Sequence, residues 1–369
     1  MLRFRRRGLE PLDASGFVGD AEAVWPGMRP LKLDKPGDVD AVSGATSRPW
    51  IDSNAWYARL LRSALAPKAV WLAFEPPDDG RPVAPDAYLV AMADSEAGGG
   101  RWVVSLDRAL RAGLADGRTD AREAFARVAR SAAFFARHAA WGGYRHVGQI
   151  AVVSDFEGGN EFLSRELLNL LGRRSALYTP IAKARADAAA LAGLDAVLYV
   201  DEAPPDGALR STLDAFATRG GTVILPAGSK ATGVPDAPAS HPRFALFRAG
   251  TGRVAVARGP VDDPERLAED AELLVGHRHD RVRIYNVGAG QHHYATSADG
   301  RAGVLHLLSY PSPYPPLTAT AWFRKRWASA RVWRADGGEP GLAPRVESAG
   351  GVEFHVPPTP TYWALEVTD

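Results

Sequence analysis

The feature that most restricts the fold of this chain is a regular alternation of apolar and amphipathic segments between residues 145 and 227. Strand-like apolar runs occupy positions 149–154, 176–181, 195–200 and 222–225, and helical spacing occupies 161–171, 188–191 and 206–219. Strands with so few polar residues must be covered on both faces. The pattern therefore predicts a doubly wound α/β domain, in which a parallel sheet lies between two layers of helices.

The segment before residue 145 combines strands and helices in a second α/β pattern. Residues 69–74 form an apolar run, residues 85–96 have helical spacing, and residues 101–107 form another strand-like run. A strand, a helix and a strand in this order predict a parallel β-α-β unit. Residues 121–140 contain few helix breakers and predict a long helix that packs on that sheet.

From residue 228 onward the sequence changes to short β-rich runs that are separated by Gly and Pro turns. The runs lie at 281–286, 303–309, 319–322, 331–333, 351–355 and 362–367. Short strands at regular spacing predict an antiparallel β-sandwich.

The length of 369 residues fits two or three domains. We expect a β/α domain at 1–144, an α/β domain at 145–227, and a linker with a β-sandwich domain at 228–369. A closed (β/α)₈ barrel takes about 250 residues, which is more than the first of these segments contains. The N-terminal domain is therefore predicted to be a partial, barrel-like β/α layer.

The charge balance and the absence of certain motifs exclude several classes of protein. Lys and Arg number 44 against 43 Asp and Glu, so the net charge of +1 argues against a broad basic face for nucleic acid. No apolar run reaches the ~18 residues that a membrane span needs. The chain has no cysteine, which excludes disulfides, Cys-ligated zinc and iron–sulfur clusters. It contains neither a phosphate-binding loop nor a dinucleotide-binding motif, and we expect no cofactor.

Two further motifs have ordinary interpretations. His277 and His279 have the spacing of metal ligands, but a third ligand does not follow, so we expect a polar loop and no metal site. The basic start at 1–7 is followed by Gly8 where an apolar segment should be, so no complete export signal is present. The expected location is therefore the cytoplasm, or the periplasm or exterior if the start is truncated.

Several motifs in the middle segment form a series, at 151–157, 161–166, 194–200 and 217–225. In the last of them a helix closes on Gly220 and Gly221 directly before an apolar strand. This series resembles the second, amidotransferase-like domain of the β-galactosidases of glycoside hydrolase family 42. The runs at 304–310 and 362–367 are similar to the small β domain that ends many glycosidases.

The resemblance implies a flavodoxin-like or amidotransferase-like α/β domain within a carbohydrate-active, multidomain architecture. In that family a catalytic barrel precedes these domains, and its paired catalytic glutamates are not mapped onto this chain. The candidate catalytic residues are therefore identified from the carboxyl groups that cleavage of a glycosidic bond requires.

Cleavage of a glycosidic bond needs two carboxyl groups, one protonated and one ionised. Glu75 and Asp107 each follow a predicted strand, and parallel-sheet enzymes hold such groups at the carboxyl ends of strands. We expect these two residues to form the catalytic pair. The alternative is that Glu75 begins a surface loop before Pro76 and that Asp107 caps the next helix.

Two groups of residues are predicted to bind substrate. Trp50, Asp52 and Asn54 combine an aromatic ring for the apolar face of a sugar with side chains that hydrogen-bond its hydroxyls. The alternative there is an N-cap at Asp52 or Ser53 for a helix that ends near residue 65.

The second predicted binding group is Asp155, Asn160 and Glu161, which lie in a loop that follows a strand and opens a helix. The carboxylates in this loop argue against phosphate as its ligand. Domain packing and helix capping by Asn160 are the alternative roles.

Together these features favour a carbohydrate-active, hydrolase-like protein that cleaves a glycosidic bond with a carboxylate pair, on a small-molecule or oligosaccharide substrate. Two alternatives stay open: a non-catalytic carbohydrate-binding or assembly protein, and a hydrolase of another ester or phosphoester. Neither a nucleic-acid partner nor a membrane partner is expected, and the formation of a homo-oligomer stays open.

Overall fold

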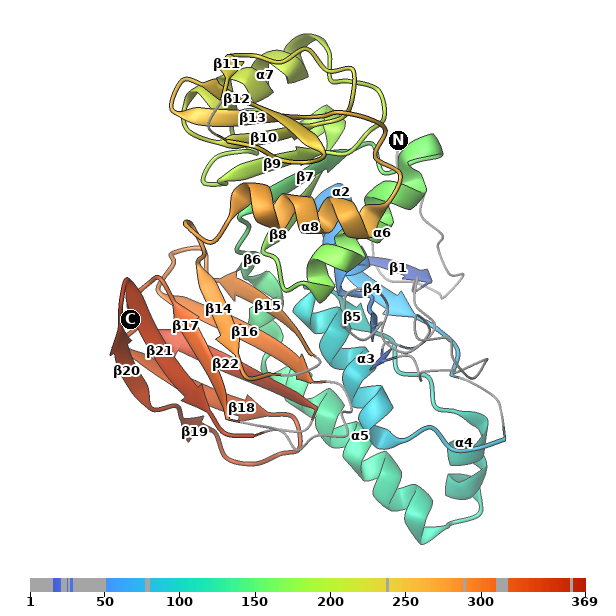
Figure 1. Ribbon diagram of the computed structural model, residues 1–369. Coiled ribbons are helices and arrows are strands. Elements are labelled where there is room, and N and C mark those ends of the chain that lie inside the picture. The colour runs from blue at the N-terminus through green and yellow to red at the C-terminus, as the bar shows by residue number, and fades with distance from the viewer. Residues whose placement is uncertain are drawn as a thin grey trace, which may run out of the picture. The chain divides into compact units, whose positions relative to one another are not determined.

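The computed structural model describes residues 16–20, 25, 27–28, 51–76, 80–236, 239–287, 290–309, 318–358 and 361–369. The described residues divide into two compact units (Figure 1). The first unit contains residues 59–66 and 147–281, and the second contains residues from 5–58, 67–146 and 282–369.

The first unit is built on a seven-stranded mixed sheet with the order β11-β12-β13-β10-β9-β7-β8. Its strands are β7 (Ile150–Ser154), β8 (Tyr178–Ala182), β9 (Ala196–Tyr199), β10 (Thr222–Leu225), β11 (Val234–Pro235), β12 (Phe244–Ala249) and β13 (Gly252–Ala257). Strands β8, β7, β9, β10 and β13 run parallel, and β12 pairs antiparallel with β13 and β11. All four apolar runs predicted between residues 145 and 227 are strands of this sheet.

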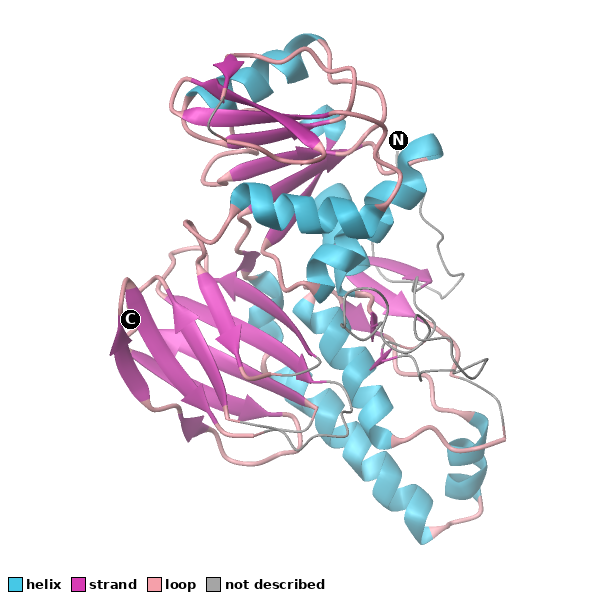
Figure 2. Cartoon of the chain, viewed as in Figure 1, coloured by secondary structure: helices cyan, strands magenta, loops and turns pink. Residues whose placement is uncertain are grey.

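Helices cover this sheet, as Figure 2 shows. They are α6 (Glu161–Arg173), α7 (Gly207–Thr218), α8 (Pro264–Val275) and the C-terminal part of α2 (Ala55–Leu65). Strand residues of both alternations are buried: Val152, Leu198 and Ile224 on one face, and Val153, Val197 and Val223 on the other. Both faces are therefore covered, as the apolar strand pattern predicted.

Two features of the first unit differ from the sequence-based expectation. Residues 188–191 form turns rather than a helix. The carboxylate of Asp187 accepts a hydrogen bond from Ala190 N–H and so caps a single turn, and Gly193 then takes a left-handed φ of 77°. The sheet also continues past residue 227, since β12 and β13, which were not predicted, extend it through a tight turn at Gly250 (φ 59°).

The second unit contains a three-stranded parallel sheet with the order β1-β4-β5. Its strands are β1 (Gly16–Asp20), β4 (Ala69–Ala73) and β5 (Arg101–Trp102), and the helices of this part are α3 (Pro85–Ala97), α4 (Arg108–Ala115) and α5 (Thr119–Arg137). Strands β4 and β5 pair in parallel with α3 between them in the chain, which confirms the predicted β-α-β unit. The strand predicted at 101–107 is shorter than expected, because Asp107 already caps α4.

Two antiparallel sheets complete the second unit (Figure 1). One has the order β19-β18-β22-β16-β15-β6 and the other β14-β17-β21-β20. Their strands are β6 (Arg145–His146), β14 (Val282–Tyr285), β15 (Gly290–Thr296), β16 (Ala302–Ser309), β17 (Ala319–Phe323), β18 (Ser329–Arg334), β19 (Gly341–Leu342), β20 (Arg345–Ser348), β21 (Gly351–Val356) and β22 (Tyr362–Thr368). A short antiparallel pair, β2 (Gly27–Met28) and β3 (Ile51–Asp52), lies elsewhere in this unit.

Aromatic contacts join these layers. Tyr294 of β15 contacts Phe323 of β17 edge to face, with 5.3 Å between ring centroids, so the two sheets pack on each other. Phe135 of α5 lies 5.3 Å from the ring of Tyr362, which places α5 on the six-stranded sheet. No helix among the described residues is long and apolar enough to cross a membrane.

Candidate functional site

The first candidate site lies at the carboxyl edge of the parallel sheet of the second unit. Glu75 follows β4 and is exposed. The half-buried Trp25 donates a hydrogen bond from its indole Nε1 to the main-chain oxygen of Glu75, at 3.3 Å. The Trp25 ring also contacts Tyr88 edge-on and Trp102 at a tilt, with centroid distances of 5.1 and 5.8 Å. An aromatic cluster of Trp25, Tyr88 and Trp102 therefore adjoins the Glu75 loop.

Asp107 adjoins the same aromatic cluster, but its carboxylate is buried and already bonded. It accepts hydrogen bonds from Leu110 N–H at 2.8 Å, Tyr88 O–H at 2.9 Å and Val83 N–H at 3.2 Å. The bond to Leu110 N–H is the N-cap of α4, which confirms the capping role that the sequence left open. Burial also raises the pKa of Tyr88 to about 12, so this phenol is a stable donor.

We expect the substitution Asp107→Ala to lower the free energy of unfolding by about 2–3 kcal/mol, because it removes a cap and leaves buried donors unpaired. Asp107→Asn should cost less, since Asn is an equally good cap residue. Urea titration measures both values. Asp116→Ala, at an exposed position after the same helix, is the control, and an equal loss in Asp107→Ala and Asp116→Ala would contradict the capping role.

The group predicted around Trp50 lies only partly within the described residues. Trp50 lies outside the described residues, and for Asp52 the structure describes the backbone of β3 alone. Asn54 is fully buried, and its N–H donates to the carboxylate of Asp94 on α3. Ser53 Oγ donates to the same carboxylate at 2.6 Å. Asn54 thus belongs to a buried cap at the start of α2.

Asp94, which the sequence analysis did not single out, is the centre of this buried cap. Burial raises the pKa of its carboxyl to about 7, although the donors from Ser53 and Asn54 act in the opposite direction. No signal in the local sequence marks this residue, because its partners lie about forty positions earlier in the chain.

The second candidate site lies at the carboxyl edge of the sheet of the first unit, where Asp155 follows β7. Its carboxylate accepts from Asn160 Nδ2 at 3.1 Å and from Glu157 N–H at 3.2 Å. Asn160 in turn accepts from Glu202 N–H at 3.1 Å. Glu161 points to a different partner, Arg165, one helical turn along α6 at 2.7 Å. Asp155 and Asn160 are therefore brought together, and Glu161 is not part of their network.

Asp201, which the sequence analysis missed, links this network to a lysine. Its buried carboxylate accepts from Ser154 Oγ at 2.6 Å, from Lys183 Nζ at 2.5 Å and from Asp155 N–H at 3.1 Å. Burial lowers the pKa of Lys183, but its bond to Asp201 and the charge of Asp201 outweigh this and raise it. Lys183 therefore stays charged. The available signal was position, since Asp201 directly follows the apolar run 195–200, much as Asp155 follows 149–154.

A cavity of about 470 Å³ lies beside this network. Asn160 and Glu202 supply polar atoms on its wall, and apolar side chains such as Phe162, Ile224 and Phe244 supply the rest. This size and this mixture are typical of pockets for small ligands. Phe162 is 70% exposed, so an aromatic face is open to a ligand there.

The described residues contain no group of three or more His, Asp and Glu side chains that is placed to hold a metal ion. His277 is exposed, and its Nδ1 lies 2.9 Å from the carboxylate of Asp280.

No protein-family model and no curated protein matches the sequence. Solved structures do match. An α-L-fucosidase isoenzyme 2 from Paenibacillus thiaminolyticus is 13% identical with a TM-score of 0.59, and the match covers 85% of this chain and 62% of that one. A β-galactosidase from Bacillus circulans sp. alkalophilus is 10% identical with a TM-score of 0.55, over 85% and 57% of the two chains. A catalytic mutant of Gan42B, a GH42 β-galactosidase from G. stearothermophilus, is 12% identical with a TM-score of 0.51, over 85% and 56%.

At these identities the matches show the fold alone, and this chain spans between 56% and 62% of the length of those chains. The fold that they share with it is mixed α/β with several sheets, at least one of them antiparallel. The fold of this chain is therefore similar to that of the fucosidase and of the two β-galactosidases.

Proposed function

We propose that this chain is a carbohydrate-active protein that cleaves a glycosidic bond at the carboxyl edge of the β1-β4-β5 sheet. The observation that carries the proposal is the exposed residue Glu75, whose main-chain oxygen bonds to the half-buried Trp25. A sugar stacks its apolar face on such a ring, and a carboxyl group beside the ring can reach the glycosidic oxygen. The glycoside hydrolase-like fold supports the same class of substrate.

In this proposal Glu75 is the general acid that protonates the leaving oxygen, and Asp107 is the second carboxyl group of the pair. Trp25 takes the platform role that the sequence analysis gave to Trp50. The chain then holds a partial barrel-like layer, an amidotransferase-like domain and a β-sandwich, as in a reduced family 42 architecture. The amidotransferase-like domain takes in β12 and β13. Its 470 Å³ cavity takes a separate ligand, which Asn160 contacts while Asp155 holds the Asn160 side chain in place.

A screen of chromogenic glycosides and esters, with and without a chelator, tests the proposed reaction. Glycoside turnover that a chelator does not change is the expected result. Chelator-sensitive cleavage of esters alone would instead assign the chain to the ester or phosphoester hydrolases.

Two aromatic substitutions test which site holds the sugar. We expect Trp25→Ala to raise KM for the best glycoside about tenfold, which corresponds to a loss of about 1.4 kcal/mol of binding. Phe162→Ala, which opens the other cavity, should leave KM unchanged. Steady-state kinetics on both variants, with melting temperatures as a check on folding, gives the answer. The reverse pattern would move the substrate site to the 470 Å³ cavity.

Sugar binding without cleavage is the second candidate function, and the hydrogen bonds that the Asp107 carboxylate already accepts favour it. Three donors already bond to that carboxylate, and a chain in which Asp107 acts only as a helix cap would bind a sugar without cleaving it. Oligosaccharide binding by calorimetry, with no turnover of any glycoside, would select this function.

A further inference from the structure

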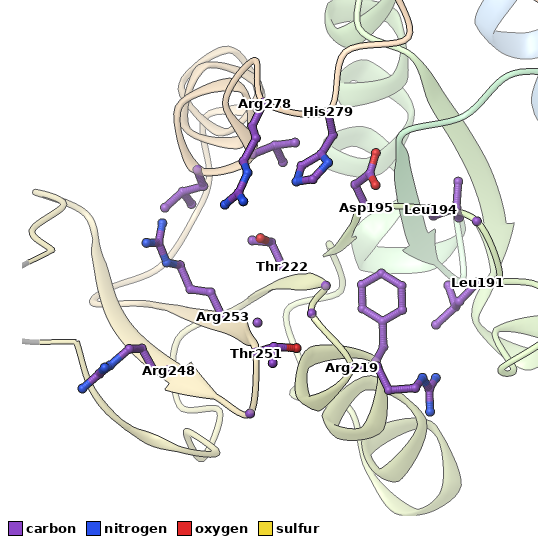
Figure 3. A pocket seen from close by; sticks show the side chains of 18 of the residues that line it. Leu191, Leu194, Asp195, Arg219, Thr222, Arg248, Thr251, Arg253, Arg278 and His279 are labelled. Carbon is purple, nitrogen blue, oxygen red and sulfur yellow. The ribbon is translucent and has the colours of Figure 1, made fainter. Parts of the chain in front are cut away.

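A second and larger cavity lies in the first unit, at the amino edge of its parallel strands. Its volume is about 950 Å³ (Figure 3). Asp195 before β9, Thr222 at the start of β10 and Thr251 in the turn between β12 and β13 contribute to its wall. The proposed glycosidase site and the 470 Å³ cavity both lie at the carboxyl edges of their sheets. The larger cavity lies at the opposite, amino edge, so the function proposed above does not use it.

The wall of this cavity is rich in arginine. Arg253 and Arg278 approach the space from two sides, and His279 lies beside Arg278, as Figure 3 shows. Arg219 and Arg248 also line the cavity. These residues come from separate segments of the chain, so the fold rather than a local run of sequence gathers the positive charge.

The acidic groups of the cavity are already balanced. Asp195 forms an ion pair with Arg281, and Asp236 lies 3.5 Å from Arg253 and 3.6 Å from Arg248. Four arginines line the cavity, and Arg281 is the partner of Asp195. These five arginines exceed the two carboxylates by about three positive charges. The carboxyl ends of α7 and α8 face this edge and carry about half a negative charge each, which leaves an excess of about two positive charges.

We propose that this cavity binds a ligand that carries at least two oxyanion groups, such as carboxylates, sulfates or phosphates. A guanidinium group donates two parallel hydrogen bonds to each of these anions. The guanidinium groups of Arg253 and Arg278 approach from different walls, so a ligand with spaced anionic groups gains more than a single small anion does. The hydroxyls of Thr222 and Thr251 add hydrogen-bonding partners for the neutral part of the ligand.

Isothermal titration of the whole chain tests this site with trigalacturonate, inorganic sulfate and inorganic phosphate, and with neutral maltotriose for comparison. The expected result is that trigalacturonate binds more tightly than either inorganic anion and that maltotriose does not bind. Comparison among the three anionic probes identifies the group that the site prefers. Raising NaCl from roughly 50 to roughly 300 mM should weaken binding, because the arginines are partly exposed and salt screens them.

The double variant Arg253→Gln/Arg278→Gln should weaken anion binding by about tenfold or more, since two charge-assisted contacts are lost. Arg258→Gln/Arg301→Gln removes the same charge at exposed positions outside the cavity and should leave the affinity within about twofold, because distant exposed charges are screened.

If both double variants weaken anion binding equally, the anions respond to the overall positive charge of the protein and not to this cavity, which would contradict the proposal. Unchanged affinity in the first variant would also overturn the proposal, as would a Kd for trigalacturonate weaker than about 1 mM on the native chain. Glycoside turnover is not a readout here, so the result is independent of the function proposed above.

Discussion

The substitution Glu75→Gln is expected to lower kcat/KM for the best glycoside by a factor of ~10²–10⁴, the usual contribution of general acid catalysis. The amide keeps the size and polarity of the side chain but has no proton to give to the leaving oxygen. Because Glu75 is exposed, and because Trp25 bonds to its main-chain oxygen, which the substitution keeps, the melting temperature should stay unchanged.

A matched control is present in the same unit. Glu339 is also exposed and also precedes a proline, so Glu339→Gln makes the same chemical change in a similar loop. Its kinetics should equal those of the native chain. If Glu75→Gln also retains full turnover at an unchanged melting temperature, Glu75 is the start of a surface loop and the glycosidase proposal loses its acid.

Substrates with different leaving groups provide a second test of the Glu75→Gln variant. A substrate whose leaving group is a good one, such as a nitrophenol, needs little protonation, whereas an unactivated disaccharide needs it fully. The loss of kcat/KM in Glu75→Gln should therefore be larger for the disaccharide. An equal loss on both substrates would indicate that Glu75 binds the sugar and does not donate a proton.

The strands and helices were predictable where the signal is local. Apolar runs such as 150–154 and 222–225 are strands because their own residues require burial on both faces. The cap at Asp107 was also open to prediction, since its partner Leu110 is three positions away. The helix predicted at 188–191 was wrong, because a few apolar residues fit one turn as well as they fit a helix.

The candidate sites were less predictable because their partners are distant in the chain. Asp201 meets Ser154 across forty-seven positions, and only the parallel pairing of β7 with β9 brings them together. Trp25 meets Glu75 across fifty positions. The basic cavity depends on the β12–β13 hairpin, which adds Arg248 and Arg253 to an edge that the predicted sheet did not include.

The other large expected effect is a loss of stability between pH ~4 and pH ~7 that depends on Asp94. Burial raises the pKa of this carboxyl from 3.8 to about 7 in the folded chain. Between these two values the unfolded chain releases the proton and the folded chain keeps it, so the free energy of unfolding falls as pH rises. Below pH ~4 and above pH ~7 both states carry the same charge, and the dependence disappears.

Each unit of pKa difference is worth about 1.4 kcal/mol, so Asp94 alone should account for about 4 kcal/mol across this range. Asp94→Asn is neutral at every pH and can still accept the hydrogen bond from Ser53 Oγ. It should be less stable than the native chain at pH ~4, where it loses one backbone acceptor bond worth about 1 kcal/mol, and more stable at pH ~7.

Urea titrations of the native chain and of Asp94→Asn across this pH range measure the crossing of the two curves. Asp116→Asn, at an exposed position, removes the same charge and should run parallel to the native curve. Glu96 is a second test of the same cause, because burial raises its pKa to about 7 against the opposing charge of Arg101. Glu96→Gln should therefore also reduce the decrease in the free energy of unfolding between pH ~4 and pH ~7. A difference between the native chain and Asp94→Asn that stays constant with pH would mean that Asp94 is ionised in the folded chain, as a cap held by the positive end of α2 rather than as a neutral buried acid.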